Sequence, residues 1–354
     1  MTVRVAIVND LRLAVEALRR VVVSVPGAQV AWIAEDGRQA LEKCRADRPD
    51  VVLMDLIMPV MDGVESTRRI MAECPCPIIV VTATVDGNAS KVYDALGHGA
   101  LDAVNTPVLG PKGDLSGGEP LVRKIEMVAR MFRPASAPRP SAAPVPAKTP
   151  SVVGASIVAI GSSTGGPQAL AKVLGSLPKD LAAPVVIVQH VDAEFVPGLA
   201  RWLSEQVGRL VRVAEPGPLS PREVVVAGHN RHLVVEPGGI LAYRDEPADS
   251  LHRPSVDVLF RSLVASRVRP GVAVLMTGMG RDGAEGLLEL RRAGWCTIAQ
   301  DRASSVVWGM PGTAVQLGAA ELVLALPEIA DGIARAFRAN VPPPAPAPGK
   351  GTSR

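Results

Sequence analysis

The sequence predicts two α/β domains, each built on a parallel sheet with helices on both faces. A chain of 354 residues that is 47% hydrophobic but only 3% aromatic can form two aliphatic cores. Short apolar runs alternate with amphipathic stretches, which is the pattern of repeated strand–helix units. Residues 134–150 include six Pro and five Ala, a composition typical of a linker between domains.

The apolar runs give the order of the elements. In the first segment we expect five strands, at residues 3–8, 31–34, 51–54, 78–81 and 100–104. Helical spacing of apolar residues predicts a helix after each strand, at residues 14–23, 40–46, 66–72, 90–96 and 121–132. In the second segment we expect strands at residues 156–160, 184–188 and 272–276 and a helix at 284–293. The predicted domains are therefore 1–132 and 152–340, with a linker at 133–151 and a disordered Pro-rich tail at 341–354.

The charge distribution argues against a nucleic-acid-binding domain. Residues 1–130 carry 15 basic and 17 acidic side chains, and residues 151–340 carry 18 of each, so the net charge of +3 arises in the Pro-rich segments. Four cysteines show neither a disulfide framework nor paired zinc spacing, which favours the cytoplasm. The longest uncharged stretch, 149–171, is broken by Ser, Thr and Gly-Gly, so we expect no membrane insertion.

Polar residues follow three of the strands expected in the first domain. Asp10 follows the first strand, Asp55 the third and Thr82 the fourth. The carboxyl ends of parallel strands meet at one edge of the sheet, where ligands gather. Two carboxylates there would bind a hard cation such as Mg²⁺ beside a phosphoryl group. The alternative is that both aspartates only cap helices.

Residues 51–63, VVLMDLIMPVMDG, resemble the response-regulator receiver family. The resemblance implies a five-stranded parallel (βα)5 receiver domain in which Asp55 is the phosphoacceptor. It further implies that Asp10, Asp55 and the Ile57 carbonyl bind Mg²⁺ and that Thr82 is the switch hydroxyl. This chain departs from the family at three positions, which are Asn9 in place of an acid, Thr106 in place of a Lys and Ala103 in place of an aromatic residue.

Strand ends in the second domain carry a possible acyl-transfer triad. Ser163 lies in a G-x-S-x-G turn after one strand, His190 follows a second and Asp282 follows a third. Asp282 would orient His190, and His190 would deprotonate Ser163. The alternatives are a buried structural histidine at a strand end and an aspartate that caps a helix. The remaining candidates for the histidine are His229, His232 and His252.

The loop that holds Asp282 also fits a competing motif. Residues 278–283 match G-x-G-x-x-G after a strand, and Asp301 follows 18 residues beyond Gly283, as in a dinucleotide-binding site. A carboxylate at position 282 would repel a pyrophosphate held by that loop. The dinucleotide hypothesis of an oxidoreductase is therefore the weaker of the two.

Five sequence blocks resemble the catalytic domain of the chemotaxis protein-glutamate methylesterases, the CheB family. They are AIGSSTGGP at 159–167, VQH at 188–190, HRPSVD at 252–257, LMTGMGRDGA at 275–284 and SVVWGMP at 305–311. The resemblance implies a doubly wound parallel α/β domain that hydrolyses glutamate methyl esters and can deamidate glutamine. Ser163, His190 and Asp282 would be the catalytic residues, and Met279 and Thr164 the oxyanion donors.

The same resemblance implies the partners and the regulation. The substrate would be a methyl-accepting chemoreceptor-like protein, and a CheA-type histidine kinase would phosphorylate the receiver, which otherwise covers the esterase cleft. The esterase would need no cofactor, whereas the receiver would need Mg²⁺. Within the family the chain most resembles the methylesterases of Wsp-type surface-sensing pathways. The alternative function is a phosphate sink or kinase-binding regulator with incidental esterase activity.

Overall fold

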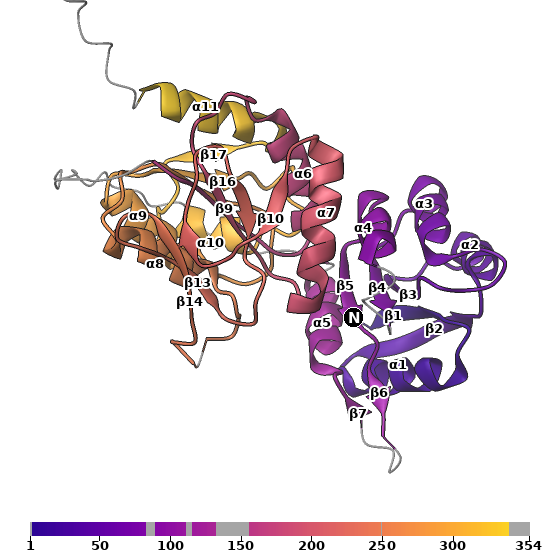
Figure 1. Ribbon diagram of the computed structural model, residues 1–354. Coiled ribbons are helices and arrows are strands. Elements are labelled where there is room, and N and C mark those ends of the chain that lie inside the picture. The colour runs from indigo at the N-terminus through magenta and orange to yellow at the C-terminus, as the bar shows by residue number, and fades with distance from the viewer. Residues whose placement is uncertain (1, 83–88, 111–114, 132–155, 249, 340–354) are drawn as a thin grey trace, which may run out of the picture.

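Figure 1 shows two lobes, a receiver lobe in indigo to magenta and a second lobe in rose to yellow. The computed structural model describes residues 2–82, 89–110, 115–131, 156–248 and 250–339. The predicted linker at 133–151 and tail at 341–354 lie outside the described residues. No helix in the described ranges is both long and apolar enough to cross a bilayer.

The first lobe is the five-stranded parallel sheet that the sequence predicts. Its strands run in the order β2 (Ala28–Ala34), β1 (Val3–Val8), β3 (Val51–Met54), β4 (Ile78–Thr82) and β5 (Asp102–Asn105). The first face is covered by α1 (Arg12–Ser24) and α5 (Glu119–Met131), and the other by α2 (Gly37–Ala46), α3 (Gly63–Glu73) and α4 (Ala89–Gly97). Because helices cover both faces, strand residues such as those of β3 are buried on both sides, which explains their unbroken aliphatic run.

The second lobe contains a seven-stranded sheet that is parallel throughout. Its order is β10 (Val211–Val213), β12 (Val224–Val226), β9 (Val185–Gln189), β8 (Val158–Ser162), β15 (Val272–Leu275), β16 (Cys296–Gln300) and β17 (Leu322–Leu324). One face packs on α6 (Gly166–Ser176), α7 (Val196–Val207) and α11 (Ile329–Ala339), and the other on α8 (Val256–Ala265), α9 (Ala284–Arg292) and α10 (Met310–Gln316). The predicted doubly wound parallel fold is confirmed.

Several short elements were not predicted. A small antiparallel sheet joins β11 (Gly217–Pro218), β14 (Ile240–Arg244) and β13 (His232–Glu236). A hairpin of β6 (Val108–Leu109) and β7 (Leu115–Ser116) follows β5, and two 3-10 turns, η1 (Ala193–Phe195) and η2 (Leu326–Glu328), precede α7 and α11. Strands of two residues are too short to show an alternating pattern, so periodicity does not reveal them.

The two lobes pack directly against each other, with α4 and α5 of the receiver facing the second lobe (Figure 1). The buried Tyr93 hydroxyl on α4 donates a hydrogen bond to the carbonyl of Phe195 at 2.9 Å. Its ring lies 5.8 Å from that of Trp202 on α7, centroid to centroid. Apolar residues of both lobes belong to one continuous buried cluster. The lobes therefore share a packed interface in addition to their chain connection.

Candidate active site

The candidate nucleophile and base follow two neighbouring parallel strands. Ser162, the last residue of β8, pairs in register with Gln189, the last residue of β9. The backbone N–H of His190 donates to the carbonyl of Ser162 at 3.0 Å. Ser163 and His190 are therefore the next residues along adjacent strands, at the carboxyl edge where doubly wound sheets hold their ligands.

His190 and the third candidate residue, Asp282, are in direct contact. Nε2 of His190 lies 2.8 Å from Oδ2 of Asp282, and the two side chains are 8% and 11% exposed. Asp282 lies in the loop between β15 and α9, and β15 is the neighbour of β8 on the side opposite β9. The structure thus brings all three predicted residues to one edge, from three adjacent strand ends.

Asp282 is held by the first turn of helix α8. Its carboxylate accepts the Ser255 hydroxyl at 2.7 Å and the backbone N–H groups of Val256 at 2.7 Å and Asp257 at 3.0 Å. Burial raises the pKa of Asp282, but the hydrogen bond and charge of His190 and these further donors outweigh it and hold the pKa well below its ordinary value. The carboxylate remains ionised and fixed, as the partner of a catalytic histidine must be.

The nucleophile turn is braced by the buried amide of Gln189. Gln189 accepts a hydrogen bond from the Ser162 hydroxyl at 2.7 Å and donates to the carbonyl of Ser163 at 2.8 Å. The turn then enters α6 through Gly165, whose φ of +75° lies in the left-handed region that favours glycine. A Cβ on the next residue, Gly166, would lie 1.9 Å from Oε1 of Gln189. Glycine is therefore required at 165 for the backbone conformation and at 166 for the close approach of the bracing amide.

Ser163 and His190 are not hydrogen-bonded to each other in this state. Among the described residues no bond joins the Ser163 hydroxyl to the imidazole, and Nδ1 of His190 is buried without a partner. Because Nε2 faces Asp282, Nδ1 is the ring nitrogen that remains to accept a proton. Catalytic hydrogen bonds of this kind often form only when substrate is bound.

The other candidate histidines have different surroundings. His229 packs edge-on against Tyr243, with centroids 4.5 Å apart, and the buried His232 accepts the N–H of Ser255 at 3.2 Å. His252 stacks on His190 itself, with centroids 4.0 Å apart and an angle of 12° between the ring planes. Of these rings, His190 is the one that is hydrogen-bonded to Asp282.

The competing dinucleotide motif lacks the free groups that it needs. Asp282 is buried within the glycine loop, where its charge opposes a pyrophosphate. Asp301, the candidate ribose ligand, instead accepts both the backbone N–H and the hydroxyl of Ser304, at 2.9 and 2.6 Å. These contacts favour the hydrolase over the dinucleotide hypothesis.

Residues of the receiver occupy the candidate oxyanion region. The buried Thr164 hydroxyl donates to Oδ2 of Asp102 on β5 at 3.0 Å, and the N–H of Gly165 donates to the carbonyl of Leu101 at 3.2 Å. The Lys124 ammonium on α5 also pairs with Asp102. The half-buried side chain of Met279 packs against the receiver cluster between the sheet and α1 and α5. The receiver therefore covers the candidate active site and is hydrogen-bonded to its nucleophile turn.

The candidate phosphorylation site lies at the carboxyl edge of the receiver sheet. Asp55, 9% exposed, follows β3 and accepts the N–H of Leu56 at 2.7 Å. Burial raises the pKa of Asp55 to about 6, and the charge of Asp10 acts in the same direction. The N–H donors of Leu56 and Ile57 lower this pKa, but they do not offset burial. The buried Thr82 ends β4, and its carbonyl accepts the N–H of Thr106 at 2.9 Å.

This donor set fits a divalent cation. Asp10 is exposed, so its carboxylate faces solvent beside Asp55. Two neighbouring ionised carboxylates repel each other, and a bound cation would offset this repulsion. Within the described residues no three His, Cys, Asp or Glu side chains form a metal cluster. The predicted ligand set is instead two carboxylates with the Ile57 carbonyl.

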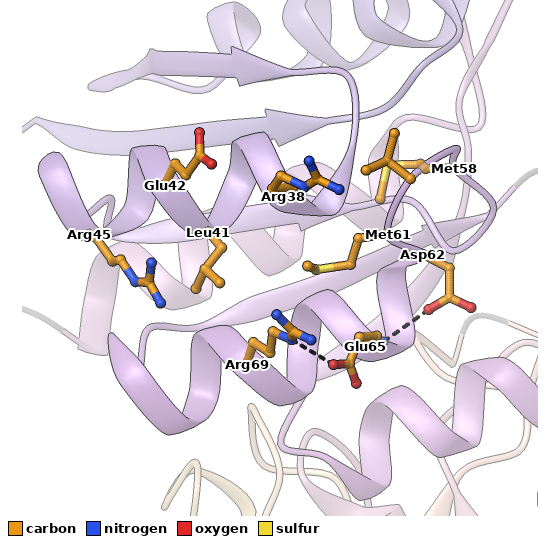
Figure 2. Close-up of a pocket in the computed structure, with 10 residues that line it drawn as sticks. Arg38, Leu41, Glu42, Arg45, Met58, Met61, Asp62, Glu65 and Arg69 are labelled. Atoms are coloured by element: carbon orange, nitrogen blue, oxygen red, sulfur yellow. Dashed lines mark hydrogen bonds and ion pairs between the residues drawn. The ribbon is translucent and has the colours of Figure 1, made fainter.

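A separate hollow lies between α2 and α3, on the side of the receiver away from the second lobe. Figure 2 shows that charged side chains line it, with Arg69 paired to Glu65 and the Asp62 carboxylate accepting the N–H of Glu65. Asp62 thereby caps α3. Arg45 pairs instead with Glu73, and Asp62 with Lys91, neither of which lines the hollow. The hollow is remote from the Ser163 edge.

Two positioning residues were missed by the sequence analysis. Ser255 and Gln189 lie within the sequence blocks at 252–257 and 188–190, but neither carries a reactive group that would single it out. Ser255 links the α8 N-terminus to Asp282, and Gln189 braces the turn of Ser163. A serine just before an apolar helical run is the N-cap signal that could have identified Ser255.

Comparisons with known proteins identify relatives of both lobes. A family model described as CheB methylesterase matches residues 158–333, and one described as response regulator receiver domain matches residues 5–111. A Cupriavidus pinatubonensis protein named protein-glutamate methylesterase/protein-glutamine glutaminase 1 is 48% identical, over 96% of this chain and 99% of its own length. Protein-glutamate methylesterase/protein-glutamine glutaminase 3 of Pseudomonas aeruginosa is 47% identical, over 94% of this chain and 99% of its own.

A crystal structure of the CheB methylesterase catalytic domain of Thermotoga maritima is 34% identical to this chain. It matches 52% of this chain and 99% of that one, with a TM-score of 0.49. The family assignment rests on the sequence matches, which span both lobes. The chain belongs to the CheB methylesterase family, in the arrangement in which a response regulator receiver domain precedes the methylesterase domain.

Proposed function

We propose that the chain hydrolyses γ-methyl esters of glutamate on a chemoreceptor-like protein and deamidates glutamine by the same route. The observation that carries the proposal is the buried His190–Asp282 pair at the strand end next to Ser163. Such a pair activates a neighbouring hydroxyl as a nucleophile. The names of the relatives add the substrate class, a protein glutamate ester or glutamine amide.

The proposed reaction has two stages. Ser163 attacks the ester carbonyl while Nδ1 of His190 takes its proton, and the tetrahedral intermediate then expels methanol, which receives that proton. Water, deprotonated by His190, attacks the acyl-enzyme and releases the glutamate carboxylate with Ser163 restored. Asp282 stabilises the imidazolium that forms in both stages. No step requires a metal or cofactor in the esterase lobe.

The tetrahedral intermediate carries a negative oxygen that needs preorganised donors. We assign this role to the backbone N–H of Met279, with help from the Thr164 hydroxyl. Met279 is followed by Gly280, whose φ of +84° lets the loop turn sharply beside the nucleophile. Thr164 is adjacent to Ser163, but its hydroxyl is bonded to Asp102 of the receiver in the present arrangement.

We propose that the receiver inhibits the esterase until Asp55 is phosphorylated by a CheA-type histidine kinase. The bonds from Thr164 to Asp102 and from Gly165 to Leu101 support this, because they engage the turn that must receive the substrate. Asp10, Asp55 and the Ile57 carbonyl would hold Mg²⁺, which when bound neutralises phosphoryl oxygens. Thr82 would follow the phosphoryl group as the switch hydroxyl.

The remaining assignments follow from the substrate and the resemblance. A methyl-accepting receptor and its kinase place the proposed site of action in the cytoplasm, and the four free cysteines fit a reducing compartment. We propose a Wsp-type surface-sensing pathway as the setting. We also propose domain limits of 1–132 and 152–340.

The decisive experiment measures methanol release from a chemoreceptor that its methyltransferase has methylated. The full chain is assayed with and without acetyl phosphate as phosphodonor, beside Ser163→Ala. We expect release by the wild-type chain, stimulation by the phosphodonor and no release by a folded Ser163→Ala protein. Undiminished release by that variant would rule out the triad. A wild-type rate that is the same with and without phosphodonor would rule out inhibition by the receiver.

A further inference from the structure

His252 is the aromatic residue that covers the ring of the proposed base. Its imidazole lies 4.0 Å from that of His190, centroid to centroid, with only 12° between the two planes. Nearly parallel rings at this distance are in van der Waals contact over their faces. The contact joins the end of β9 to the loop before α8, two segments that are far apart in the sequence.

The loop that carries His252 is held in place by its own hydrogen bonds. The Ser250 hydroxyl donates to the carbonyl of His252 at 3.0 Å, and the Arg253 guanidinium donates to the carbonyl of Ala248. Three residues beyond His252, Ser255 is bonded to Asp282. The same short segment therefore supplies both the ring that stacks on His190 and a donor to its carboxylate partner.

His190 needs such a contact because a single hydrogen bond does not fix a ring plane. The bond from Nε2 to Asp282 fixes one atom of the imidazole, and the ring can still rotate about that contact. Nδ1 must point at Ser163 when the substrate arrives, yet it has no partner of its own in the described residues. A flat neighbour on the ring face restricts this rotation.

We propose that His252 is a positioning residue for the esterase reaction, because its flat ring fixes the plane of His190 and stabilises the imidazolium that His190 becomes. The inference rests on the proposed function. His252 does not exchange a proton with the substrate in this scheme, and it acts only through His190. An aromatic face next to a cation is attractive, so the contact strengthens as His190 takes up its proton.

This role requires that His252 itself stays uncharged. Burial, with a further contribution from the neighbouring His190, lowers the pKa of His252 to about 4, while the charge of Asp282 acts in the opposite direction. Arg123 and Lys124 of the receiver helix α5 also face His252 and act in the same direction as burial. At neutral pH His252 therefore stays uncharged beside the ring that exchanges a proton in the proposed reaction.

The test uses three variants of the full chain, all assayed with acetyl phosphate. His252→Phe keeps a flat ring without a titratable nitrogen, and His252→Leu has a similar volume without a flat face. The matched control is His229→Leu, which removes a histidine that packs on Tyr243. Circular dichroism checks folding, and His252→Gln replaces His252→Leu if the leucine variant does not fold.

The first readout is labelling of Ser163 by a fluorophosphonate. The Ser163 oxygen forms a bond to phosphorus, fluoride leaves and His190 takes the proton, so the rate reports the Ser163–His190 pair without the receptor. We expect His252→Leu to label roughly ten- to a hundredfold more slowly, as for a misplaced catalytic group. His252→Phe should retain most of the rate, and His229→Leu should match the wild type.

The second readout is methanol release from the methylated receptor as a function of pH. We expect His252→Leu to lower kcat with little change in KM and to move the acid limb of kcat/KM to lower pH, because the imidazolium loses its aromatic neighbour. The acid limb of His252→Phe should stay in place. If His252 had a purely structural role, its replacement would change the folded fraction without moving the acid limb of kcat/KM.

Two results would overturn the inference. Wild-type labelling rates in a folded His252→Leu protein would show that the stack does not position His190. A higher KM with unchanged kcat would mean that His252 contacts the substrate instead. Failure of the proposed function is a different result, because wild-type protein would then release no methanol or would leave Ser163 unlabelled.

Discussion

Replacing Asp55 by Asn is expected to stabilise the receiver at neutral pH. Burial raises the pKa of this carboxyl from 3.8 to about 6, and the charge of Asp10 acts in the same direction. A tenfold change in a protonation equilibrium corresponds to about 1.4 kcal/mol, so the ionised Asp55 costs the folded state up to about 3 kcal/mol. Asparagine has no charge to bury and retains an oxygen that can accept the N–H of Leu56.

The pH dependence gives the sign of the effect. Because the pKa of Asp55 is higher in the folded state than in the unfolded chain, its protonation stabilises the fold fully below pH 4. That stabilisation is lost as the pH rises to about 6. The free energy of unfolding of Asp55→Asn should therefore exceed that of the wild type at pH 7 and approach it at pH 4. Millimolar Mg²⁺ should reduce the difference, because a bound cation offsets the carboxylate charge.

The assay is urea unfolding of the full chain, followed by hydrogen exchange. Exchange in peptides that contain β1 and β3 reports the unfolding of the receiver separately from that of the esterase lobe. A gain of about 3 kcal/mol corresponds to a rise of roughly 1–3 M in the urea midpoint. Asp94→Asn, an exposed carboxylate on α4, is the matched control and should leave the midpoint unchanged. An equal gain for Asp55→Asn at pH 4 and pH 7 would refute the electrostatic argument.

Three further substitutions test the interface, the triad and the packing. Asp102→Ala removes the carboxylate that accepts the hydroxyl of Thr164, and a hydrogen bond to a charged group is worth about 1.5–3 kcal/mol. Methanol release without phosphodonor should therefore rise roughly tenfold or more. The control Asp47→Ala, within the receiver, should not change this rate. Asp282→Asn should lower kcat by about 10³- to 10⁴-fold in a steady-state assay and leave KM nearly unchanged. Gly161→Ala places a Cβ 2.3 Å from Cγ1 of Val256 and should lower stability by about 1–3 kcal/mol, seen as a lower Tm.

The sequence predicts buried parallel strands well because burial on both faces demands an unbroken aliphatic run. The bounds expected for β1 and β3 are those observed. The expected start of β5 at residue 100 is wrong by two residues, because Ala100 and Leu101 are apolar but lie between the preceding turn and the strand. The hairpin of β13 and β14 was missed, although Gly238 and Gly239 between its apolar runs are a turn signal.

The sequence predicts those residues of the candidate site that directly follow a strand. Ser163, His190 and Asp282 each follow a strand of the same parallel sheet, so their convergence follows from topology. The donors that hold Asp282 come from the N-terminus of α8, an element whose approach depends on tertiary packing. The stacking of His252 on His190 likewise depends on a loop conformation that residue spacing does not encode. The sequence alone shows which side chains carry reactive groups, whereas the residues that hold those side chains in place are brought together by tertiary packing.

Strand β5 is the element through which the receiver site and the esterase site can be coupled. Its first residue, Asp102, and the preceding Leu101 accept hydrogen bonds from the nucleophile turn. At its carboxyl end, Asn105 pairs in register with Thr82, the proposed switch residue, and its side chain donates to Glu194 before α7 at 3.5 Å.

Because β5 contacts both the proposed switch residue and the esterase lobe, we expect a shift at one end of this short strand to reach the other. Receivers commonly use an aromatic residue for this purpose, whereas the side chain of Ala103 is only a methyl group, which has no alternative rotamer. We therefore expect the backbone and polar ends of β5 to carry the signal, so that Asn105→Ala should weaken the response to phosphodonor while the esterase chemistry itself is retained.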